Sequence, residues 1–171
     1  MFKTKEIENI LDTCEKREHA LSNLSKLSIE DIDYLSFISK YKDCEITPDI
    51  RIFGYEEALN ANNYITKEYP ETAESVWQIG NTGIGDQWFI DKKTQSVLFY
   101  DHDQGEYDNS EFIDMEIKFY DFVKMGFLLR SLEDFLDDNT SYDTDIVEKE
   151  FRTRMNKISP ELYEKYPYNW I

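Results

Sequence analysis

Three glycines and an aspartate stand close together in the stretch "GNTGIGD", at Gly80, Gly83, Gly85 and Asp86. Clustered glycines cradle phosphate groups when a helix follows them directly and a lysine with a serine or threonine completes the loop. Here a carboxylate follows the last glycine, and the next residues, "QWFID", are typical of a strand. We therefore predict no nucleotide site. The glycines instead predict a turn that needs positive φ angles or close backbone approach, with Asp86 accepting hydrogen bonds from the turn's own amides.

A second candidate stretch, "DHDQGEYDNSE", is dense in carboxylates. From Asp101 to Glu116 the chain has seven acidic residues and no lysine or arginine. His102 lies among them, and oxygen-rich sets of this kind can bind Ca²⁺ or Mg²⁺. The spacing of an EF-hand loop is absent, however, and the other histidine, His19, lies far away in the sequence. The pattern allows adventitious binding of divalent ions, but we predict no dedicated metal site and no cofactor.

Catalysis has equally little support from the residue types present. His102 with Asp103 or with Ser110 would resemble a general base with a partner. No nucleophile elbow, zinc-protease helix or deaminase signature accompanies it. We predict no catalytic residues and no enzymatic activity. An acidic-site, metal-dependent hydrolase built on Asp101–Glu111 ranks third among our functional hypotheses.

Net charge is the strongest compositional signal in this chain of 171 residues. It has 36 Asp and Glu against 19 Lys and Arg, for a formal net charge of −17. Nucleic acid and anionic membranes should repel such a chain, whereas a basic protein surface should attract it. Aromatic residues make up 15% of the chain, which is too many for a disordered acidic tail. We expect a folded acidic domain whose partner is a basic protein.

Cellular location is inferred from what the sequence lacks. It has no apolar run long enough to cross a membrane, and its first residues have no signal-peptide pattern. Cys14 and Cys44 have no cysteine or histidine cluster around them and lie in segments expected to be helical. We therefore predict reduced thiols in a cytoplasmic protein.

Helices are expected before and after a group of strands. An amphipathic helix is predicted over 4–25, and the capping pattern "SIED" at Ser28 predicts the start of a second. A third helix is predicted over 55–69, ended by Pro70. Strand-like segments alternate with polar turns over 75–102, which predicts a three-stranded antiparallel meander with both faces largely covered.

The rest of the chain is predicted to return to helix. The pattern "SLED" at Ser131 predicts another helix start, and helices over 144–168 follow. Tyr168 and Trp170 either cap the core, which we favour, or offer a surface for weak self-association. This order of elements favours an α+β fold with a central, mostly antiparallel sheet and helices packed around it. We expect a single domain over 1–171 with its core at about 28–139.

The strand-and-turn region resembles the core of the SUKH superfamily, which includes bacterial immunity proteins and the yeast cell-wall assembly regulator. The likeness is carried by the glycine turn before a strand, "GNTGIGDQWFID", by the strand end "VLFYDHD" and by the helices "SLEDFLDD" and "SIEDIDYLSFISKY". It covers roughly Ser28 to Asn139 and is most specific over Val76–Asp103. The turn is longer than the family's, and the stretch from Gly105 to Tyr120 is longer and more acidic.

The resemblance implies a SUKH-like α+β domain that binds proteins and has no enzymatic activity. Bacterial members neutralise toxins, many of them nucleases or deaminases, by tight binding. We therefore expect an immunity protein, monomeric or weakly dimeric, that binds a cognate toxin domain with a basic surface. A regulatory protein-binding scaffold is the alternative. The residues expected to contact the partner combine carboxylates with aromatics: Asp101, His102, Asp103, Glu106, Tyr107, Asp108, Glu111 and Phe112.

Overall fold

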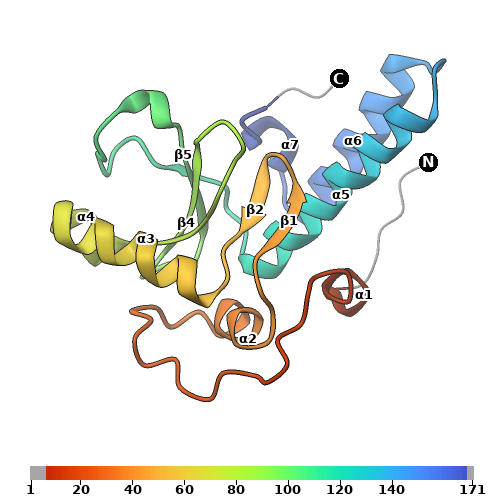
Figure 1. The fold of residues 1–171 in the computed structure, drawn as a ribbon. Helices are drawn as coiled ribbons and strands as arrows, with labels where there is room; N and C mark the ends of the chain where they lie inside the picture. Colours follow the sequence, from red (N-terminus) through yellow and green to blue (C-terminus); the bar gives the residue numbers. More distant parts are fainter. Residues whose placement is uncertain (1–6, 169–171) are drawn as a thin grey trace.

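A six-stranded sheet forms the centre of the structure, a computed structural model that describes residues 7–168 (Figure 1). All neighbouring strands are antiparallel, and their order in the sheet follows their order in the chain. The strands are β1 (Cys44–Thr47), β2 (Ile50–Ile52), β3 (Val76–Asn81), β4 (Gln87–Asp91), β5 (Val97–Tyr100) and β6 (Ile113–Asp114).

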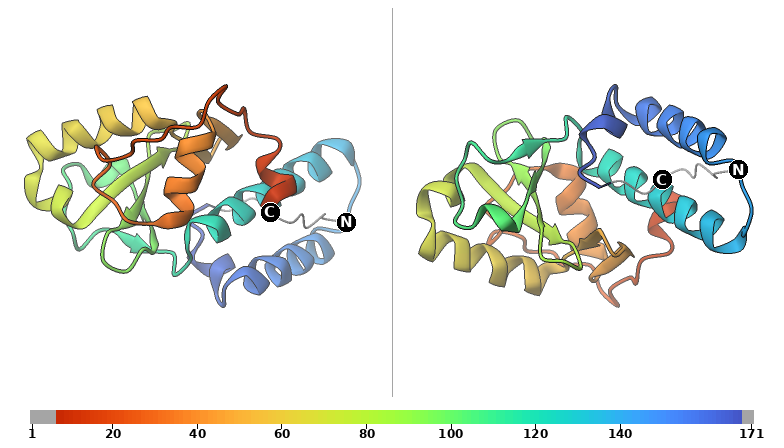
Figure 2. Two further views of the ribbon diagram at one scale, coloured as in Figure 1. Left: turned by 90° about the horizontal axis from the view of Figure 1, so that it is seen from below. Right: turned by 90° about the horizontal axis from the view of Figure 1, so that it is seen from above.

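Helices pack around this sheet, and the predicted α+β class is confirmed. Figure 2 shows α5 and α6 lying side by side and extending past the sheet, while α3 and α4 border its opposite end. No helix within residues 7–168 has the length and apolar character that crossing a membrane requires. The helices are α1 (Ile7–Leu11), α2 (Ile32–Lys40), α3 (Tyr55–Glu68), α4 (Pro70–Ser75), the 3₁₀ turn η1 (His102–Gln104), α5 (Phe119–Asp138), α6 (Thr144–Ile158) and α7 (Leu162–Lys165).

The predicted three-stranded meander is present as β3, β4 and β5, and both of its faces are covered. Successive side chains of a strand point to opposite faces. Trp88 therefore packs in the larger core against Phe122 of α5, with 4.9 Å between ring centroids, whereas its neighbour Phe89 belongs to a smaller core on the other face. Both rings are fully buried, which explains why apolar residues follow one another here without polar alternation.

A hairpin of β1 and β2 extends the sheet beyond this meander. β2 pairs with β3 through Ile52 and Gly80. A Cβ atom at Gly80 would lie 2.2 Å from the carbonyl oxygen of Arg51. Glycine at this position therefore lets the two strands approach closely enough to pair.

The prediction of a long N-terminal helix over 4–25 is wrong within the described residues. α1 ends at Leu11, and the chain then runs irregularly alongside the C-terminal end of α2. Backbone hydrogen bonds hold it there, from the Arg17 amide to the Lys40 carbonyl at 2.8 Å and from the Leu21 amide to the Ser39 carbonyl at 2.8 Å. Tertiary pairing with α2 has replaced the local helix that the apolar spacing favours.

Both predicted capping boxes are also misplaced. Asp31, not Ser28, is the N-cap of α2, and its carboxylate accepts a 2.8 Å hydrogen bond from the Tyr34 amide. Ser131 lies inside α5, which begins at Phe119. A capping pattern starts a helix only when the preceding backbone is not helical, and here the buried face of α5 continues from Leu129 straight into Leu132.

The two cysteines are joined in a disulfide, so the prediction of reduced thiols in helical segments is wrong. Cys14 follows α1 and Cys44 begins β1, and their Cα atoms are 5.5 Å apart across a sequence separation of 30 residues. The bond attaches the irregular N-terminal segment to the sheet. It lies beside further attachments of the same segment, including the 2.9 Å hydrogen bond from the Lys42 amide to the Glu15 carbonyl.

Removing this disulfide should destabilise the protein. We expect the double variant Cys14→Ser/Cys44→Ser to lose about 2–4 kcal/mol of unfolding free energy, because the unfolded chain regains the entropy of an open loop. Urea denaturation with and without a reductant measures the loss. The reductant should lower the stability of the wild type to that of the variant and leave the variant unchanged; a wild type insensitive to reductant would show that the bond does not contribute.

Candidate functional site

The predicted contact residues lie on the connection from β5 to β6, which Figure 1 shows as a broad loop at one end of the sheet. We call residues 101–112 the acidic loop. Its carboxylates face solvent, with Asp101 half-buried and the others exposed. The two aromatics of the set are half-buried instead. The loop is therefore divided between an exposed charged surface and an apolar attachment.

Tyr107 and Phe112 attach the acidic loop to the smaller core. The Tyr107 ring lies 5.1 Å from Tyr100 and 5.8 Å from Phe89, and the Phe112 ring lies 5.0 Å from Phe89. The Tyr107 hydroxyl donates to Oε1 of Gln87 at 2.5 Å, and burial raises the pKa of Tyr107 to about 12. These two residues serve first to hold the loop against the sheet.

Short-range hydrogen bonds shape the exposed part of the loop. The Asp101 carboxylate caps η1 by accepting from the Asp103 amide at 2.8 Å. The Asp108 carboxylate accepts from the amide of Ser110 at 2.8 Å and from its hydroxyl at 2.7 Å, and these bonds lower the pKa of Asp108. The Tyr100 hydroxyl donates to the Glu106 carbonyl at 2.8 Å. The carboxylates are consequently presented on a backbone that is already ordered.

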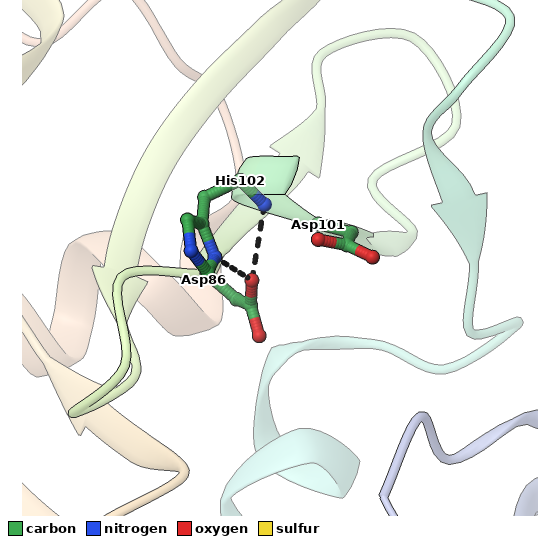
Figure 3. Close-up of side chains that lie close together, drawn as sticks. All are labelled: Asp86, Asp101 and His102. Carbon is green, nitrogen blue, oxygen red and sulfur yellow. Dashed lines mark hydrogen bonds and ion pairs between the residues drawn. The ribbon is translucent and has the colours of Figure 1, made fainter. Parts of the chain in front are cut away.

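The buried residue Asp86 contacts the exposed residue His102 at the start of the acidic loop (Figure 3). One carboxylate oxygen of Asp86, Oδ1, accepts from the His102 backbone amide at 3.0 Å and is 2.6 Å from ring atom Nδ1. The other oxygen, Oδ2, accepts from the Tyr168 hydroxyl. Asp86 is only 3% exposed. Through these hydrogen bonds, Asp86 at the start of β4 is linked to His102 after β5 and to Tyr168 in the C-terminal segment.

The hydrogen bonds between Asp86, His102 and Tyr168 shift the pKa values of Asp86 and His102. Burial alone would raise the pKa of Asp86, but hydrogen bonds from Tyr168 and His102 outweigh it and lower that pKa below the ordinary 3.8. The hydrogen bond to Asp86 raises the pKa of His102 above the ordinary 6.5, with help from the nearby charge of Asp103. The Asp86 carboxylate therefore contributes its full stabilisation above about pH 3.8 and loses it as the pH falls through its lowered pKa. The protonated His102 contributes fully below about pH 6.5, and this contribution is lost as the pH rises through its raised pKa.

The glycine turn differs from its prediction in the role of Asp86. The carboxylate does not bond the turn's own amides; those are served by Thr82, whose hydroxyl accepts from the Asp86 amide at 3.0 Å. Gly85 has φ +107°, and a Cβ atom there would lie 3.6 Å from the His102 ring. Gly83 has ordinary φ and donates to the Pro48 carbonyl at 2.7 Å. The turn brings Asp86 to His102, which the sequence did not indicate.

Asp86, Asp101 and His102 also come close enough to be considered as metal ligands, since one ligand atom from each lies within 4.8 Å of the others. Both oxygens of Asp86 are engaged, however, one by His102 and one by Tyr168. A metal ion bound to Asp86 would have to displace these donors. The side-chain partners of His102 are Asp86 and Asp103, while the Ser110 hydroxyl is bonded to Asp108.

Comparison with family models, curated proteins and solved structures gives no match. The SUKH resemblance and the function it implies stay predictions.

Within residues 7–168, eleven carboxylates outside the loop form an ion pair with a lysine or arginine, whereas those inside it form none. Arg152 binds Glu148 at 2.9 Å and Glu164 at 2.8 Å, and Arg51 likewise holds two carboxylates. Within residues 7–168, by contrast, none of the five acidic side chains from Asp101 to Glu111 forms an ion pair with a lysine or arginine. The acidic loop is a surface whose charge is left uncompensated.

The C-terminal tyrosine predicted to cap the core does so. Tyr168 packs against the larger core with its ring 5.7 Å from Phe99, and its hydroxyl donates to Oδ2 of Asp86. Burial and this hydrogen bond raise the pKa of Tyr168. Trp170, named with it in the sequence analysis, lies outside the described residues.

Glu133 of α5 has a shifted pKa, and nothing in the sequence predicted it. Its Oε1 atom is buried and has no hydrogen-bond partner among the described residues. Burial, followed by the nearby charges of Asp49 and Asp134, raises the pKa of Glu133 to about 6. Nothing distinguishes this residue from other acidic residues on a helix until the tertiary structure buries it.

Replacing Asp86 tests how much the hydrogen bonds from His102 and Tyr168 to its carboxylate stabilise the fold. We expect Asp86→Ala to lower the unfolding free energy by about 1–3 kcal/mol, because three donors are left without their acceptor. In Asp86→Asn the pKa of the His102 imidazole, followed by NMR, should fall from above 6.5 toward the ordinary value. Asp103→Ala is the control, because its side chain is 83% exposed and its loss should cost little stability. An unchanged His102 titration in Asp86→Asn would contradict the assigned role.

Glu133 should destabilise the fold at neutral pH. Because its folded-state pKa is raised, the charged form is disfavoured in the native protein, and stability falls as the pH rises from about 4.5 to about 6. We expect Glu133→Gln to gain about 1 kcal/mol at pH 7.5, a value reduced for partial exposure, and to gain almost nothing at pH 4. Urea denaturation at both pH values measures this. Asp138→Asn on the same helix is the exposed control; equal gains at both pH values would exclude the titration of Glu133 as the cause.

Proposed function

We propose that this chain is a non-enzymatic immunity protein that binds and neutralises a cognate toxin domain carrying a basic surface. One observation carries the proposal: an ordered, solvent-facing loop holds five carboxylates that no lysine or arginine within residues 7–168 neutralises. Like charges held close together repel one another, and a basic partner would relieve that repulsion. Elsewhere within residues 7–168, eleven carboxylates are each paired with a lysine or arginine, so the complete absence of such pairs distinguishes the loop from those parts of the surface.

The ordering of the loop bears on affinity. A flexible acidic segment would lose conformational entropy on binding, whereas a loop already attached through Tyr107 and Phe112 loses little. The net charge of −17 would also accelerate encounter with a basic domain and penalise acidic competitors. Both features suit tight one-to-one inhibition of a nuclease or deaminase with a basic substrate groove. We propose that nucleic acid and membranes are not partners and that self-association is weak or absent.

The same surface would serve a regulatory scaffold, which is the alternative function carried over from the sequence. A cytoplasmic location is part of the proposal, but the Cys14–Cys44 disulfide opposes it, because disulfides persist mainly in oxidising compartments. Mass spectrometry of the protein alkylated at the moment of cell lysis would show whether the bond exists in the cell. A fully alkylated pair would support the cytoplasmic assignment, and an unmodified pair would move the protein to an oxidising compartment.

Charge reversal in the acidic loop tests the function. The binding partner for the test is the C-terminal domain of any large secreted protein encoded beside this chain, and the absence of such a protein would favour the scaffold function. We expect Asp103→Lys/Glu111→Lys to weaken that complex at least tenfold, or about 1.4 kcal/mol, and to reduce the dependence of the association rate on salt. The affinity is measured by surface plasmon resonance, together with protection against the toxicity of the domain.

The matched control is Asp137→Lys/Asp138→Lys, which makes the same change of charge at the exposed end of α5, far from the loop in Figures 1 and 2. Equal weakening by both variants would reduce the effect to net charge. If the neighbouring domain binds and is not neutralised, the scaffold function takes the place of immunity. If it does not bind at all, the immunity function fails.

A further inference from the structure

Three tyrosines form a continuous aromatic surface beside the acidic loop. Tyr64 of α3 lies 6.3 Å from Tyr69, and Tyr69 lies 5.0 Å from Tyr107 of the loop, measured between ring centroids. We call these three residues the tyrosine cluster. Its outermost ring, Tyr64, is 56% exposed, and its innermost, Tyr107, packs on the buried rings of the smaller core. The cluster thus offers an exposed aromatic ring on a rigid support.

Carboxylates flank this cluster. Glu68 stands one helical turn after Tyr64, and Glu106 directly precedes Tyr107. Burial, then the neighbouring Tyr64 hydroxyl and the charges of Glu106 and Glu68, raise the pKa of Tyr69, which places both carboxylates in the electrostatic surroundings of that ring. Glu68 is paired at 2.6 Å with Lys67, whose side chain is 81% exposed and able to move away. Glu106 has no basic partner within residues 7–168.

The chain itself shows what such an arrangement binds. On α6, the guanidinium of Arg152 lies 4.3 Å from the centre of the Tyr163 ring and is held at the same time by Glu148 at 2.9 Å and Glu164 at 2.8 Å. A planar cation stacks on an aromatic face while its N–H groups bond to carboxylates. The tyrosine cluster has the same components, an aromatic ring and two carboxylates, but no arginine.

We propose that the tyrosine cluster, flanked by Glu68 and Glu106, is the site that binds an arginine side chain of the basic partner. Tyrosine and arginine are over-represented among the few residues that dominate the affinity of protein interfaces, and exposed rings with few rotatable bonds lose little entropy on binding. Charge complementarity selects a cation as the occupant, and the ring selects guanidinium over ammonium. This inference rests on the proposed function, since it names the part of the surface where binding is strongest.

Peptides of a single residue type provide the test. The full chain is titrated by calorimetry with an oligo-arginine peptide and with an oligo-lysine peptide of equal length, at matched salt concentration. We expect the wild type to prefer the arginine peptide about fivefold, Tyr64→Ala to abolish this preference, and Tyr64→Phe to keep it, because the ring and not the hydroxyl makes the contact.

Tyr142→Ala is the matched control. Tyr142 is also exposed, at 42%, and also contacts a second ring, Phe135 at 6.0 Å, but it lies in the connection between α5 and α6. It should leave the preference unchanged. A preference that survives Tyr64→Ala would overturn the inference, and so would its equal loss in both tyrosine variants.

Failure of this inference can be separated from failure of the proposed function. If Asp103→Lys/Glu111→Lys weakens the complex with the neighbouring toxin domain and Tyr64→Ala does not, the acidic loop binds the partner without an arginine at the tyrosine cluster. If neither variant weakens that complex, the partner binds elsewhere, and both the acidic loop and the tyrosine cluster fail as its binding site. If Tyr64→Ala alone weakens it, the cluster is the binding site and the loop charges act only at long range.

Discussion

A single buried carboxylate, that of Asp86, holds the β3–β4 turn, the start of the acidic loop and the C-terminal segment together. Asp86 is removed from water, and an ionised carboxylate in that position is tolerated only when its oxygens are fully paired. Its three donors come from two other segments: the backbone amide and the ring of His102, and the hydroxyl of Tyr168. The β3–β4 turn, the start of the acidic loop and the C-terminal segment must therefore keep their mutual positions. The geometry of the candidate binding surface depends on that requirement.

The acidic loop is ordered by two different means. Its inner side is attached by aromatic packing on the smaller core, and its outer side by turns in which Asp101 and Asp108 accept from nearby amides. These bonds use some carboxylate oxygens without neutralising their charge. The surface consequently stays strongly anionic although its backbone is well held. Such a combination favours association with a basic protein over a purely solubilising role, because solubility alone requires no ordered display.

The N-terminal segment shows a competition between local and tertiary preference. Its apolar residues recur at helical spacing, yet the chain after Leu11 pairs with the end of α2 and is covalently joined to β1 through Cys14 and Cys44. A helix continued through 25 would forgo those hydrogen bonds, and a short amphipathic helix has little stability of its own to set against them. The disulfide adds to the stability of this segment, and it also favours an oxidising compartment as the place where the protein functions.

The sequence alone determined the β3–β5 meander, because apolar runs such as "VLFY" are rich in β-branched and aromatic residues, are too short for a helix, and are separated by turn residues. It also determined the α+β class and the end of α3 before Pro70, whose ring excludes a continuing helix. The acidity of the loop and its aromatic members could likewise be read from the chain. These features depend on local periodicity and residue chemistry.

Only the tertiary structure decided which groups meet. The sequence predicted that the Asp86 carboxylate accepts hydrogen bonds from amides of its own turn. In the folded protein it instead accepts from His102 and from Tyr168, which is 82 residues away in the sequence. Tyr64 joined the acidic loop through Tyr69 although α3 had no predicted link to the site. The pairing of Cys14 with Cys44 and the burial of Glu133 have the same cause. Each depends on how the helices and the sheet pack against one another, and no local pattern of residues carries that information.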